Sequence, residues 1–300
     1  MTFGVLMLTH MLDVIIVNFK STRWVLSCLD SFRGEISRQD VKVFVQDNCS
    51  DDEVERIKTL FPEAFVSINA ANIGFARAVN RALATSESPY VVILNPDTLV
   101  LDGFFSSALG YMERNHEVGV LGPAVLNDDG TVQGSARAFP TFLTGLFGRN
   151  SPLTKLLPGN AITRANIPSE RSDGKTPTEV DWVSGACMVV RRKAIAEVGP
   201  LDPRFFVYWE DADWCKRMWK KGWKVVYFPP AKVLHHVGAS SSTRPVRSLY
   251  QFHKSSYKLF YKHAGAPGRI LSPLVAFVLA LRFGLVAMSS ALRPHGNNER

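Results

Sequence analysis

The N-terminal half of the chain alternates short apolar runs with segments whose apolar residues recur every three or four positions. Runs of the first kind indicate buried strands, and segments of the second kind indicate helices that bury one face. The expected strands are 13–18, 41–46, 65–68, 90–94 and 118–121, and the expected helices are 22–32, 53–60, 75–84 and 102–114. This alternation with short connections predicts an α/β fold, a mostly parallel sheet flanked by helices on both faces.

The pattern is weaker in the second half of the chain. Asn127–Gly130 reads Asn-Asp-Asp-Gly, which predicts a hairpin turn. Periodicity then fails from about Phe139 to Pro177, and a loop this long is usually a lid, a binding loop or disordered. Regular structure is expected again at 180–190, with a helix at 210–221, strands at 224–228 and 232–235, and a helix at 247–263.

The C-terminal stretch Ile270–Leu292 is strongly apolar but contains a proline, a glycine and Arg282. With roughly 20 residues it is long enough to span a bilayer. A central arginine and a preceding basic helix favour instead a helix that lies in the membrane interface, or one that packs on the domain. The basic residues of that preceding helix would share one face and attract an anionic leaflet; they are Arg247, Lys254, Lys258 and Lys262. We therefore divide the chain into an α/β domain at 13–242 and a helical region at 243–300 that we expect to associate with a membrane.

Composition narrows the range of partners. A hydrophobic content of 46% with 21% charged residues is typical of a globular protein with a sizeable core. The net charge of +8 favours phosphorylated substrates or anionic lipid, and we expect no nucleic-acid partner. The four cysteines lie far apart without a CxxC pair, which indicates reduced thiols in a cytoplasmic protein. No basic segment precedes Phe3–Leu8, so no signal peptide is expected.

The first candidate site residue is Asp97. It follows the apolar run Tyr90–Leu94, which Asn95-Pro96 stops because proline lacks an N–H and disfavours helix in the residue before it. Asp97 is therefore expected at the carboxyl end of a central strand, where open α/β sheets bind their ligands. A carboxylate there can hold a divalent cation and, through it, a diphosphate. The alternative is a turn in which Asp97 only accepts backbone N–H groups.

Three further polar groups follow the early strands. Asn18 ends the first strand, and Asp47 ends the second, where it could accept from a ribose hydroxyl or a base N–H. Asn72 and Gly74 precede the third helix, whose N-terminal amides would favour phosphate. Each alone is more often a helix cap, but together with Asp97 they share one edge of the sheet. Neither GxGxxG nor GxxxxGK[ST] is present, so the common phosphate-binding loops are excluded.

A second group of candidates starts at Glu210. On a helix that begins there, Asp213 and Arg217 lie on a polar stripe and form an i,i+4 pair worth a few tenths of a kcal/mol. Asp211 falls instead on the apolar side, and burial there would raise its pKa toward that of a general base. The alternative is that Asp211 caps the helix. His235 and His236 end a strand, and one of them could complete a metal shell, although such a pair is more often surface or core filler.

These motifs resemble the inverting glycosyltransferases of family 2, which have the GT-A fold. The resemblance covers about Asp13–Ser241. It is carried by Val17-Asn18-Phe19, Asp47-Asn48-Cys49-Ser50, Asn72-Ile-Gly-Phe75, Asn95-Pro-Asp97, Trp182-Val-Ser-Gly-Ala186, Glu210-Asp211 and His235-His236-Val-Gly238. Asn-Pro-Asp in place of Asp-x-Asp resembles the rhamnosyltransferase branch. The run His253–Tyr257 and the basic apolar tail are similar to enzymes that put rhamnose on polyprenyl-diphosphate-linked N-acetylglucosamine.

The resemblance implies a role for each candidate. Asp47 would contact the base or ribose, with Asn18, Asn72, Gly74 and Asn95 nearby. Asp97 and His235, with His236 in reserve, would hold Mg²⁺ or Mn²⁺ on the donor diphosphate, more weakly than usual because Asn95 removes one negative ligand. Trp182, Gly185, Ala186 and Glu210 would line the acceptor side, and Asp211 would be the catalytic base.

The implied substrates are dTDP-rhamnose as donor and a lipid-linked glycan as acceptor, at the inner leaflet of the cytoplasmic membrane. One alternative is a glycosyltransferase that takes a UDP-hexose. Another is a non-catalytic protein that binds nucleotide sugars or lipid, which would leave no reason for Asp211 on an apolar face. A nucleotidyltransferase would need a second ligating aspartate and a basic Gly-rich loop, and the sequence shows neither.

Overall fold

The computed structural model describes residues 12–37, 41–50, 53–140, 166–236 and 245–291. The long loop and the domain boundary expected from the sequence lie largely outside these ranges. The strands are β1 (Leu12–Asn18), β2 (Val41–Asp47), β3 (Phe65–Ile68), β4 (Tyr90–Leu94), β5 (Thr98–Val100), β6 (Val118–Leu126), β7 (Ala136–Arg137), β8 (Thr178–Glu179), β9 (Trp182–Val183), β10 (Cys187–Arg191) and β11 (Lys224–His235). The helices are α1 (Thr22–Asp30), α2 (Arg33–Ser37), α3 (Glu55–Leu60), α4 (Phe75–Leu83), α5 (Phe104–Arg114), η1 (Pro168–Arg171), α9 (Arg192–Val198), α10 (Glu210–Lys220), α11 (Pro245–His263), α12 (Ala266–Ile270) and α13 (Ser272–Ala291).

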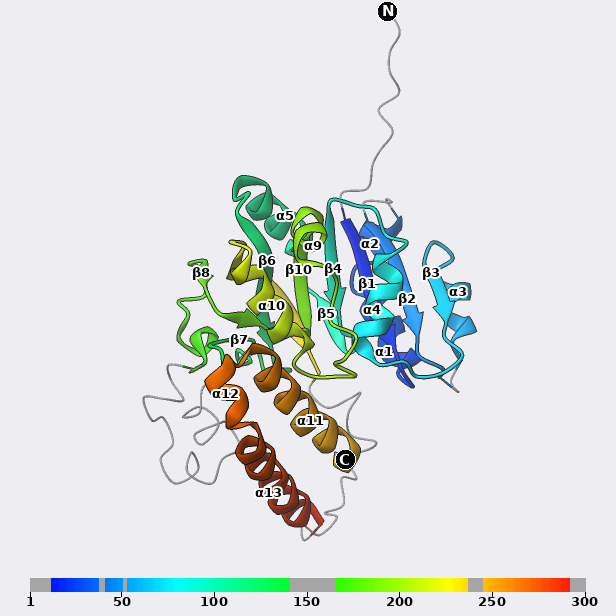
Figure 1. Ribbon diagram of the computed structural model, residues 1–300. Helices are drawn as coiled ribbons and strands as arrows, with labels where there is room; N and C mark the ends of the chain where they lie inside the picture. The colour runs from blue at the N-terminus through cyan, green and yellow to red at the C-terminus, as the bar shows by residue number, and fades with distance from the viewer. Residues whose placement is uncertain (1–11, 38–40, 51–52, 141–165, 237–244, 292–300) are drawn as a thin grey trace, which may run out of the picture.

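One sheet runs through the domain in the order β3-β2-β1-β4-β10-β6-β11-β5, with β8 also paired to β11 (Figure 1). Strands β3, β2, β1 and β4 are parallel, as the alternation of strands and helices predicts. The other half mixes directions: β10 is antiparallel to both of its neighbours, and β5 and β8 are antiparallel to β11. Strands β8, β9 and β10 follow one another with no helix between them, but each pairs with a strand from elsewhere in the chain.

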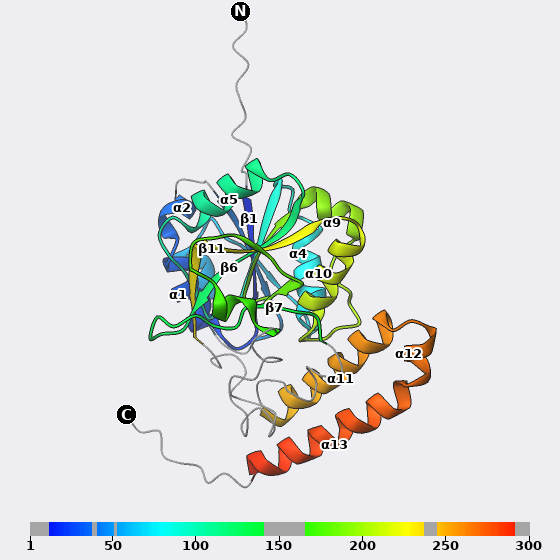
Figure 2. The same cartoon turned by 90° about the vertical axis from the view of Figure 1, so that its left-hand side faces the viewer.

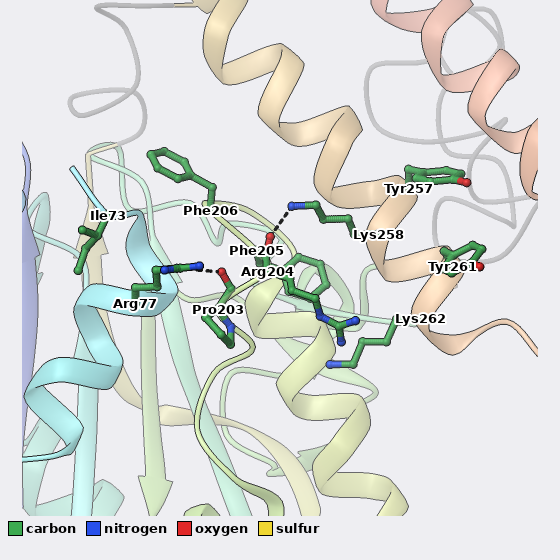
Figure 3. A pocket seen from close by; sticks show the side chains of 10 residues that line it. All are labelled: Ile73, Arg77, Pro203, Arg204, Phe205, Phe206, Tyr257, Lys258, Tyr261 and Lys262. Atoms are coloured by element: carbon green, nitrogen blue, oxygen red, sulfur yellow. Dashed lines mark hydrogen bonds between the residues drawn. The ribbon is translucent and has the colours of Figure 1, made fainter. Parts of the chain in front are cut away.

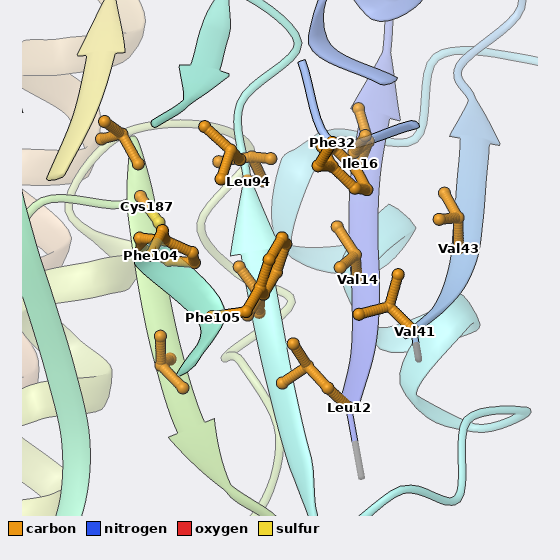
Figure 4. Packing of buried hydrophobic residues seen from close by; sticks show 14 of the residues in the cluster. Leu12, Val14, Ile16, Phe32, Val41, Val43, Leu94, Phe104, Phe105 and Cys187 are labelled. Carbon is orange, nitrogen blue, oxygen red and sulfur yellow. The ribbon is translucent and has the colours of Figure 1, made fainter. Parts of the chain in front are cut away.

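Each face of the sheet has its own hydrophobic core, because the central strands are buried on both sides. Alternate residues of β1, namely Leu12, Val14 and Ile16, point to the face that α1 and α5 cover (Figure 4). The residues between them, Ile15 and Val17, point to the opposite core, which α4, α9 and α10 cover. Burial on both faces fixes the register of the strands and therefore the positions of the residues at their carboxyl ends.

Two local predictions can be compared with the structure in the second half. The hairpin turn at 127–130 is confirmed, with the Asn127 N–H donating to the Thr131 carbonyl at 2.8 Å and Gly130 at a φ of +80°. The two strands expected at 224–228 and 232–235 form one strand, β11. Its register against β6 shifts between Phe228 and Lys232, so the two prolines there are accommodated as an irregularity.

The C-terminal helices α11, α12 and α13 lie beside the end of the domain where β1 and β4 finish (Figures 1 and 2). The expectation that four basic residues of α11 face outward is wrong for two of them. Lys258 Nζ donates to the Arg204 carbonyl, and Lys262 Nζ lies 2.7 Å from Asp202 Oδ2, so both face the α/β domain. Arg247 and the side chain of Lys254 are exposed. No helix among the described residues combines the length and the apolar character that crossing a membrane requires.

Candidate functional site

Asp97 lies at the carboxyl end of β4, in the short connection to β5, and is buried. Its Oδ1 lies 3.3 Å from Nε2 of His235, the last residue of β11, and its main-chain carbonyl accepts the His236 N–H at 2.9 Å. Nδ1 of His236 lies instead 2.6 Å from Asp128 Oδ1. Of the two candidate histidines, the structure brings His235 to Asp97 and turns the His236 ring away.

Gln133 fixes the orientation of the His235 ring. Its Nε2 donates to the His235 main-chain carbonyl at 2.7 Å, and its Oε1 lies 3.0 Å from the ring Nδ1. An amide oxygen can only accept, so Nδ1 carries a hydrogen, and when the ring is neutral Nε2 presents a lone pair toward the Asp97 carboxylate. Two acceptors that face each other are stabilised by a cation between or beside them. Gln133 sits in the hairpin and belongs to no motif, so sequence reasoning missed it.

This pair of side chains fits a divalent cation whose remaining ligands are phosphate and water oxygens. Among the described residues there is no group of three histidine, cysteine or acidic side chains that could hold a metal ion by itself. Within the described ranges the protein could therefore offer two ligands, Asp97 and His235, and a bound diphosphate would have to supply others.

Asn18 and Asp47 end adjacent parallel strands and are bonded to each other. Asn18 Nδ2 donates to Asp47 Oδ1 at 2.8 Å, and Asp47 Oδ2 accepts the Ser50 N–H at 2.9 Å. Asn18 Oδ1 accepts the Ser21 N–H at 3.1 Å. Both side chains are fully buried, so they order the loops that follow β1 and β2. A direct contact between either side chain and a nucleotide stays a prediction.

Asn72 and Gly74 shape the entry to α4. Asn72 Oδ1 accepts the Gly74 N–H at 3.0 Å. Gly74 has a φ of +87°, and a Cβ there would lie 2.6 Å from the Phe206 carbonyl oxygen, so only glycine fits. That same carbonyl accepts the N–H of Phe75, the first residue of α4, at 2.7 Å. The Phe75 amide is therefore already bonded to a carbonyl, and phosphate binding by the amides that follow it in α4 stays a prediction.

Asp211 lies in the first turn of α10. Its Oδ2 accepts the Gly185 N–H at 2.9 Å and its Oδ1 accepts the Ala212 N–H at 2.8 Å. Burial raises the pKa of Asp211, while the two N–H groups and the positive charge of Arg137 oppose that rise. Trp209 occupies the N-cap position of α10, but Asp211 still accepts a first-turn amide, so the capping alternative explains the bond from Ala212 and not the bond from Gly185. A carboxylate with a raised pKa, fixed by backbone donors, is suited to accept a proton.

The two carboxylates, Asp97 and Asp211, are connected by the segment Gly185–Ala186. The Ala186 carbonyl accepts the Asn95 N–H at 3.0 Å and the Thr98 hydroxyl at 3.4 Å, from residues on either side of Asp97. Gly185, the residue before it, donates to Asp211. Two adjacent residues thus tie the strand end that carries Asp97 to the helix start that carries Asp211.

Aromatic and basic side chains gather near the start of α10. The Trp182 ring lies 5.8 Å from the Trp209 ring, and its Nε1 donates to the Ala138 carbonyl at 2.9 Å. The Arg137 guanidinium lies 5.6 Å from the Trp182 ring centroid. Arg137 was missed by the sequence analysis because it lies in the two-residue strand β7, which gives no periodic signal.

Asp213 forms the expected i,i+4 pair with Arg217, but it lies in a buried charge cluster rather than on a solvated polar stripe. It is fully buried, and its carboxylate lies 2.9 Å from Arg217 Nε, 2.6 Å from Lys262 Nζ and 2.7 Å from His263 Nε2. Burial would raise its pKa, but these three groups lower it. Asp213 therefore holds α11 against α10, because Lys262 and His263 belong to α11.

Comparison with known proteins places this geometry in a family. The model of "Glycosyl transferase family 2" matches residues 13–199. The N-acetylglucosaminyl-diphospho-decaprenol L-rhamnosyltransferase of Mycobacterium tuberculosis is 34% identical over 88% of this chain and 90% of its own length. The rhamnosyltransferase WbbL of Escherichia coli K12 is 23% identical over 75% of this chain and 83% of its own length.

Solved structures agree on the fold. A mannosyltransferase from Pyrobaculum calidifontis, in complex with GDP-Man and Mn²⁺, superimposes with a TM-score of 0.56 at 15% identity over 96% of this chain and 76% of its own. GalNAc-T7 with UDP, GalNAc and Mn²⁺ gives a TM-score of 0.53 at 16% identity over 77% of this chain and 44% of its own. The chain belongs to glycosyl transferase family 2 and is a glycosyltransferase with the GT-A fold.

Proposed function

We propose that this enzyme transfers L-rhamnose from dTDP-rhamnose to a hydroxyl of a lipid-linked sugar in cell-envelope polysaccharide synthesis. The mycobacterial relative is named for such a transfer, and the match covers 88% of this chain. Asn95 in Asn95-Pro-Asp97 supports the same branch of the family. The donor base and sugar come from this relationship, because the described contacts do not include a base-recognising group.

The observation that carries the catalytic proposal is the connection through Gly185–Ala186. It ties the Asp97 strand end to the Asp211 helix start with hydrogen bonds of 2.9 and 3.0 Å. An inverting transfer needs a cation site at the leaving diphosphate and a base on the opposite side of the sugar. A rigid link between the two candidates supports one reaction centre rather than two unrelated turns.

Asp211 would take the proton from the acceptor hydroxyl as that oxygen attacks the anomeric carbon. The nucleoside diphosphate leaves from the opposite face, so the configuration inverts in one step and no covalent nucleophile is needed. The Gly185 N–H donates to Oδ2 and the Ala212 N–H donates to Oδ1, so both oxygens of the Asp211 carboxylate are held in place. A Mg²⁺ or Mn²⁺ ion held by Asp97 and His235 would offset the negative charge that develops on the leaving diphosphate.

The acceptor proposal places the enzyme at the inner face of the cytoplasmic membrane as a peripheral protein. Its support is the apolar surface of α12 and α13, where the side chains of Ile270, Phe277 and Leu285 are 79%, 65% and 60% exposed. Exposed apolar side chains clustered in this way favour contact with the apolar part of a membrane. Residues 13–242 would then form the catalytic domain and 243–300 the membrane-associating region.

A donor screen tests the proposal. The purified chain is incubated with a lipid-linked N-acetylglucosamine acceptor and dTDP-, UDP- or GDP-sugars, with Mg²⁺ or Mn²⁺, and transfer and anomeric configuration are measured by NMR. Preferential turnover of dTDP-rhamnose with inversion is expected. Faster turnover of a UDP-hexose would replace the donor assignment, and nucleotide binding without any turnover would support the non-catalytic alternative.

A further inference from the structure

A cavity of about 560 Å³ opens between the start of α4, the loop at Pro203–Phe206 and α11. Lys258 and Lys262 extend into it from α11, and Arg77 extends from α4 toward the same loop (Figure 3). Arg204 of the loop is the fourth basic residue on its wall. The cavity borders the α4 end of the proposed donor site, because its wall includes Ile73 and Phe206, which lie next to Gly74.

Among the described residues, two of these four basic side chains form no ion pair with a carboxylate. Arg204 and Lys262 share Asp202, at 2.6 and 2.7 Å. Arg77 Nε donates only to the Pro203 carbonyl at 3.3 Å, and Lys258 Nζ donates to the Arg204 carbonyl; within the described ranges neither forms an ion pair. The cavity therefore carries an excess of positive charge.

The electrostatic state of Lys258 is consistent with that excess. Burial lowers its pKa, and the positive charge of Lys254 lowers it further, as does that of Arg204. The opposing effect of Asp202 is smaller than the burial and Lys254 contributions. An anion bound between Arg77 and Lys258 would supply the missing negative charge and favour the protonated amine.

The rim of the cavity continues into apolar surface. Tyr261, on the cavity wall, is 47% exposed, and the Arg269 guanidinium lies 5.5 Å from its ring centroid. The next residues along the chain, Ile270 and Leu271, are 79% and 55% exposed, and Leu274 follows on α13 at 56%. A molecule with an anionic head and an apolar tail would match both parts of this surface.

We propose that the cavity binds the phosphate head of a lipid through Arg77 and Lys258, with the lipid tail lying along Ile270–Leu274. The inference rests on the proposed function, since a lipid-linked acceptor is what brings this surface to a membrane. The shared chemistry is a phosphate on a long apolar chain. Its sources are an anionic phospholipid of the leaflet and the phosphorylated polyprenyl chain of an acceptor. Arginine and lysine are well suited to such a head because both donate several hydrogen bonds to phosphate oxygens.

Vesicle sedimentation of the full-length chain tests this inference. The vesicles contain phosphatidylcholine alone, phosphatidylcholine with phosphatidylglycerol, or phosphatidylcholine with a polyprenyl phosphate at matched surface charge. The double variant Arg77→Gln/Lys258→Gln should bind both charged vesicles at least about tenfold more weakly than the parent. The matched control Arg114→Gln/Lys193→Gln removes two exposed charges from α5 and α9 and should bind like the parent.

A charge-conserving variant, Arg77→Lys/Lys258→Arg, separates loss of charge from loss of fold and should retain most of the binding. Tighter binding to polyprenyl phosphate than to phosphatidylglycerol would identify the acceptor lipid as the source, and equal binding would identify bulk phospholipid. Equal losses in the pocket and control variants would overturn the proposal, because net charge alone would then explain binding. The proposal would also be overturned if Arg77→Gln/Lys258→Gln bound the charged vesicles as tightly as the parent does.

A soluble probe removes the contribution of the membrane. Inorganic diphosphate is titrated calorimetrically in chelator with saturating dTDP, so that the donor site is filled and metal-free. We expect the parent to release or absorb heat on binding diphosphate and Arg77→Gln/Lys258→Gln to show no such heat. Equal heats of binding from the two proteins would count against a phosphate site in the cavity. Donor hydrolysis by the parent is measured separately, with Mg²⁺ or Mn²⁺ and without dTDP. Its absence there would argue against the proposed function and leave the vesicle comparison intact.

Discussion

Burial, and then the charge of the neighbouring Asp211, raise the pKa of the Glu210 carboxyl well above its ordinary value. Glu210 is buried in the first turn of α10, and its Oε2 has no hydrogen-bond partner within the described part of the chain. A neutral carboxylic acid is therefore expected beside an Asp211 that can ionise. Two adjacent carboxyls with separated pKa values suit a site in which one of them must act as a base.

The activity should show an acid limb above the pH at which an ordinary aspartate titrates, about 3.9. The base works only when deprotonated, and burial raises the pKa of Asp211, so kcat rises as pH rises through that raised value. Glu210→Gln should leave the limb in place, because it replaces a group that is already uncharged. Profiles of kcat against pH for the parent and for Glu210→Gln measure the position of the limb in each protein. A shift of the limb to lower pH in Glu210→Gln would mean that Glu210 is ionised.

Asp211→Asn should reduce transfer by about 10²–10⁴-fold while donor affinity stays nearly constant, since the change removes a base and keeps the shape. Single-turnover transfer and calorimetric titration with dTDP report the two quantities separately. Asp102→Asn makes the same chemical change at an exposed position near the start of α5 and should behave like the parent. Transfer by Asp211→Asn at close to the parent rate would show that Asp211 is structural.

Asp97→Ala should weaken dTDP binding mainly when Mg²⁺ or Mn²⁺ is present. The carboxylate acts on the nucleotide through the cation. Loss of a residue that only supports a metal ligand typically lowers metal affinity about tenfold, and loss of the ligand itself should lower it at least as much. Parent and variant are titrated with dTDP in metal and in chelator. Equal affinities under all four conditions would remove Asp97 from the nucleotide site.

Gln133→Leu should lower Mn²⁺ affinity in the presence of dTDP by about 10–100-fold, because the ring of His235 loses the acceptor that fixes its tautomer. Nitrogen-15 NMR of the imidazole gives a second readout that a general loss of stability would not produce. The parent should show the Nδ1–H form. Gln133→Glu keeps an acceptor at that position and should preserve the tautomer. A leucine variant with parent tautomer and parent Mn²⁺ affinity would contradict the assignment.

Strand ends were the most predictable part of this site. A run of apolar residues closed by Asn95-Pro96 fixes where β4 stops, so the position of Asp97 at the sheet edge follows from local sequence. The same reasoning located Asn18 and Asp47 at the ends of β1 and β2. It did not reveal that these two side chains bond each other across strands, because a local pattern carries no information about a partner 29 positions away.

Long-range partners account for the other differences. Helical spacing correctly separated Asp211 from Asp213, but it could not tell that α11, about 50 residues later, covers Asp213 with Lys262 and His263. The contact of Gln133 with His235 spans 102 positions and comes from a hairpin whose own sequence specifies only its turn. The period of a segment tells which residues share a face and leaves open what packs against that face.

The last prediction concerns the C-terminal helices. Removal of residues 266–300 should abolish co-sedimentation with anionic vesicles and preserve slow donor hydrolysis, since the reaction centre lies outside this segment. A milder test in the full chain is Leu274→Gln/Phe277→Gln, whose side chains are 56% and 65% exposed. Each apolar side chain that enters the acyl boundary contributes about 1.5–3 kcal/mol when fully buried, so a loss of at least about tenfold in vesicle affinity is expected.

The matched control for this double variant is Leu60→Gln/Ile68→Gln, whose side chains are 45% and 54% exposed on the edge formed by α3 and β3. That edge lies away from α13 (Figure 1), so the control should sediment like the parent. Membrane insertion through α13 predicts a loss confined to the first pair. Equal losses in both pairs would indicate nonspecific adsorption of exposed apolar groups. If the truncated chain sedimented like the full chain, α12 and α13 would not be the anchor, and α11 or the catalytic domain would have to reach the acceptor.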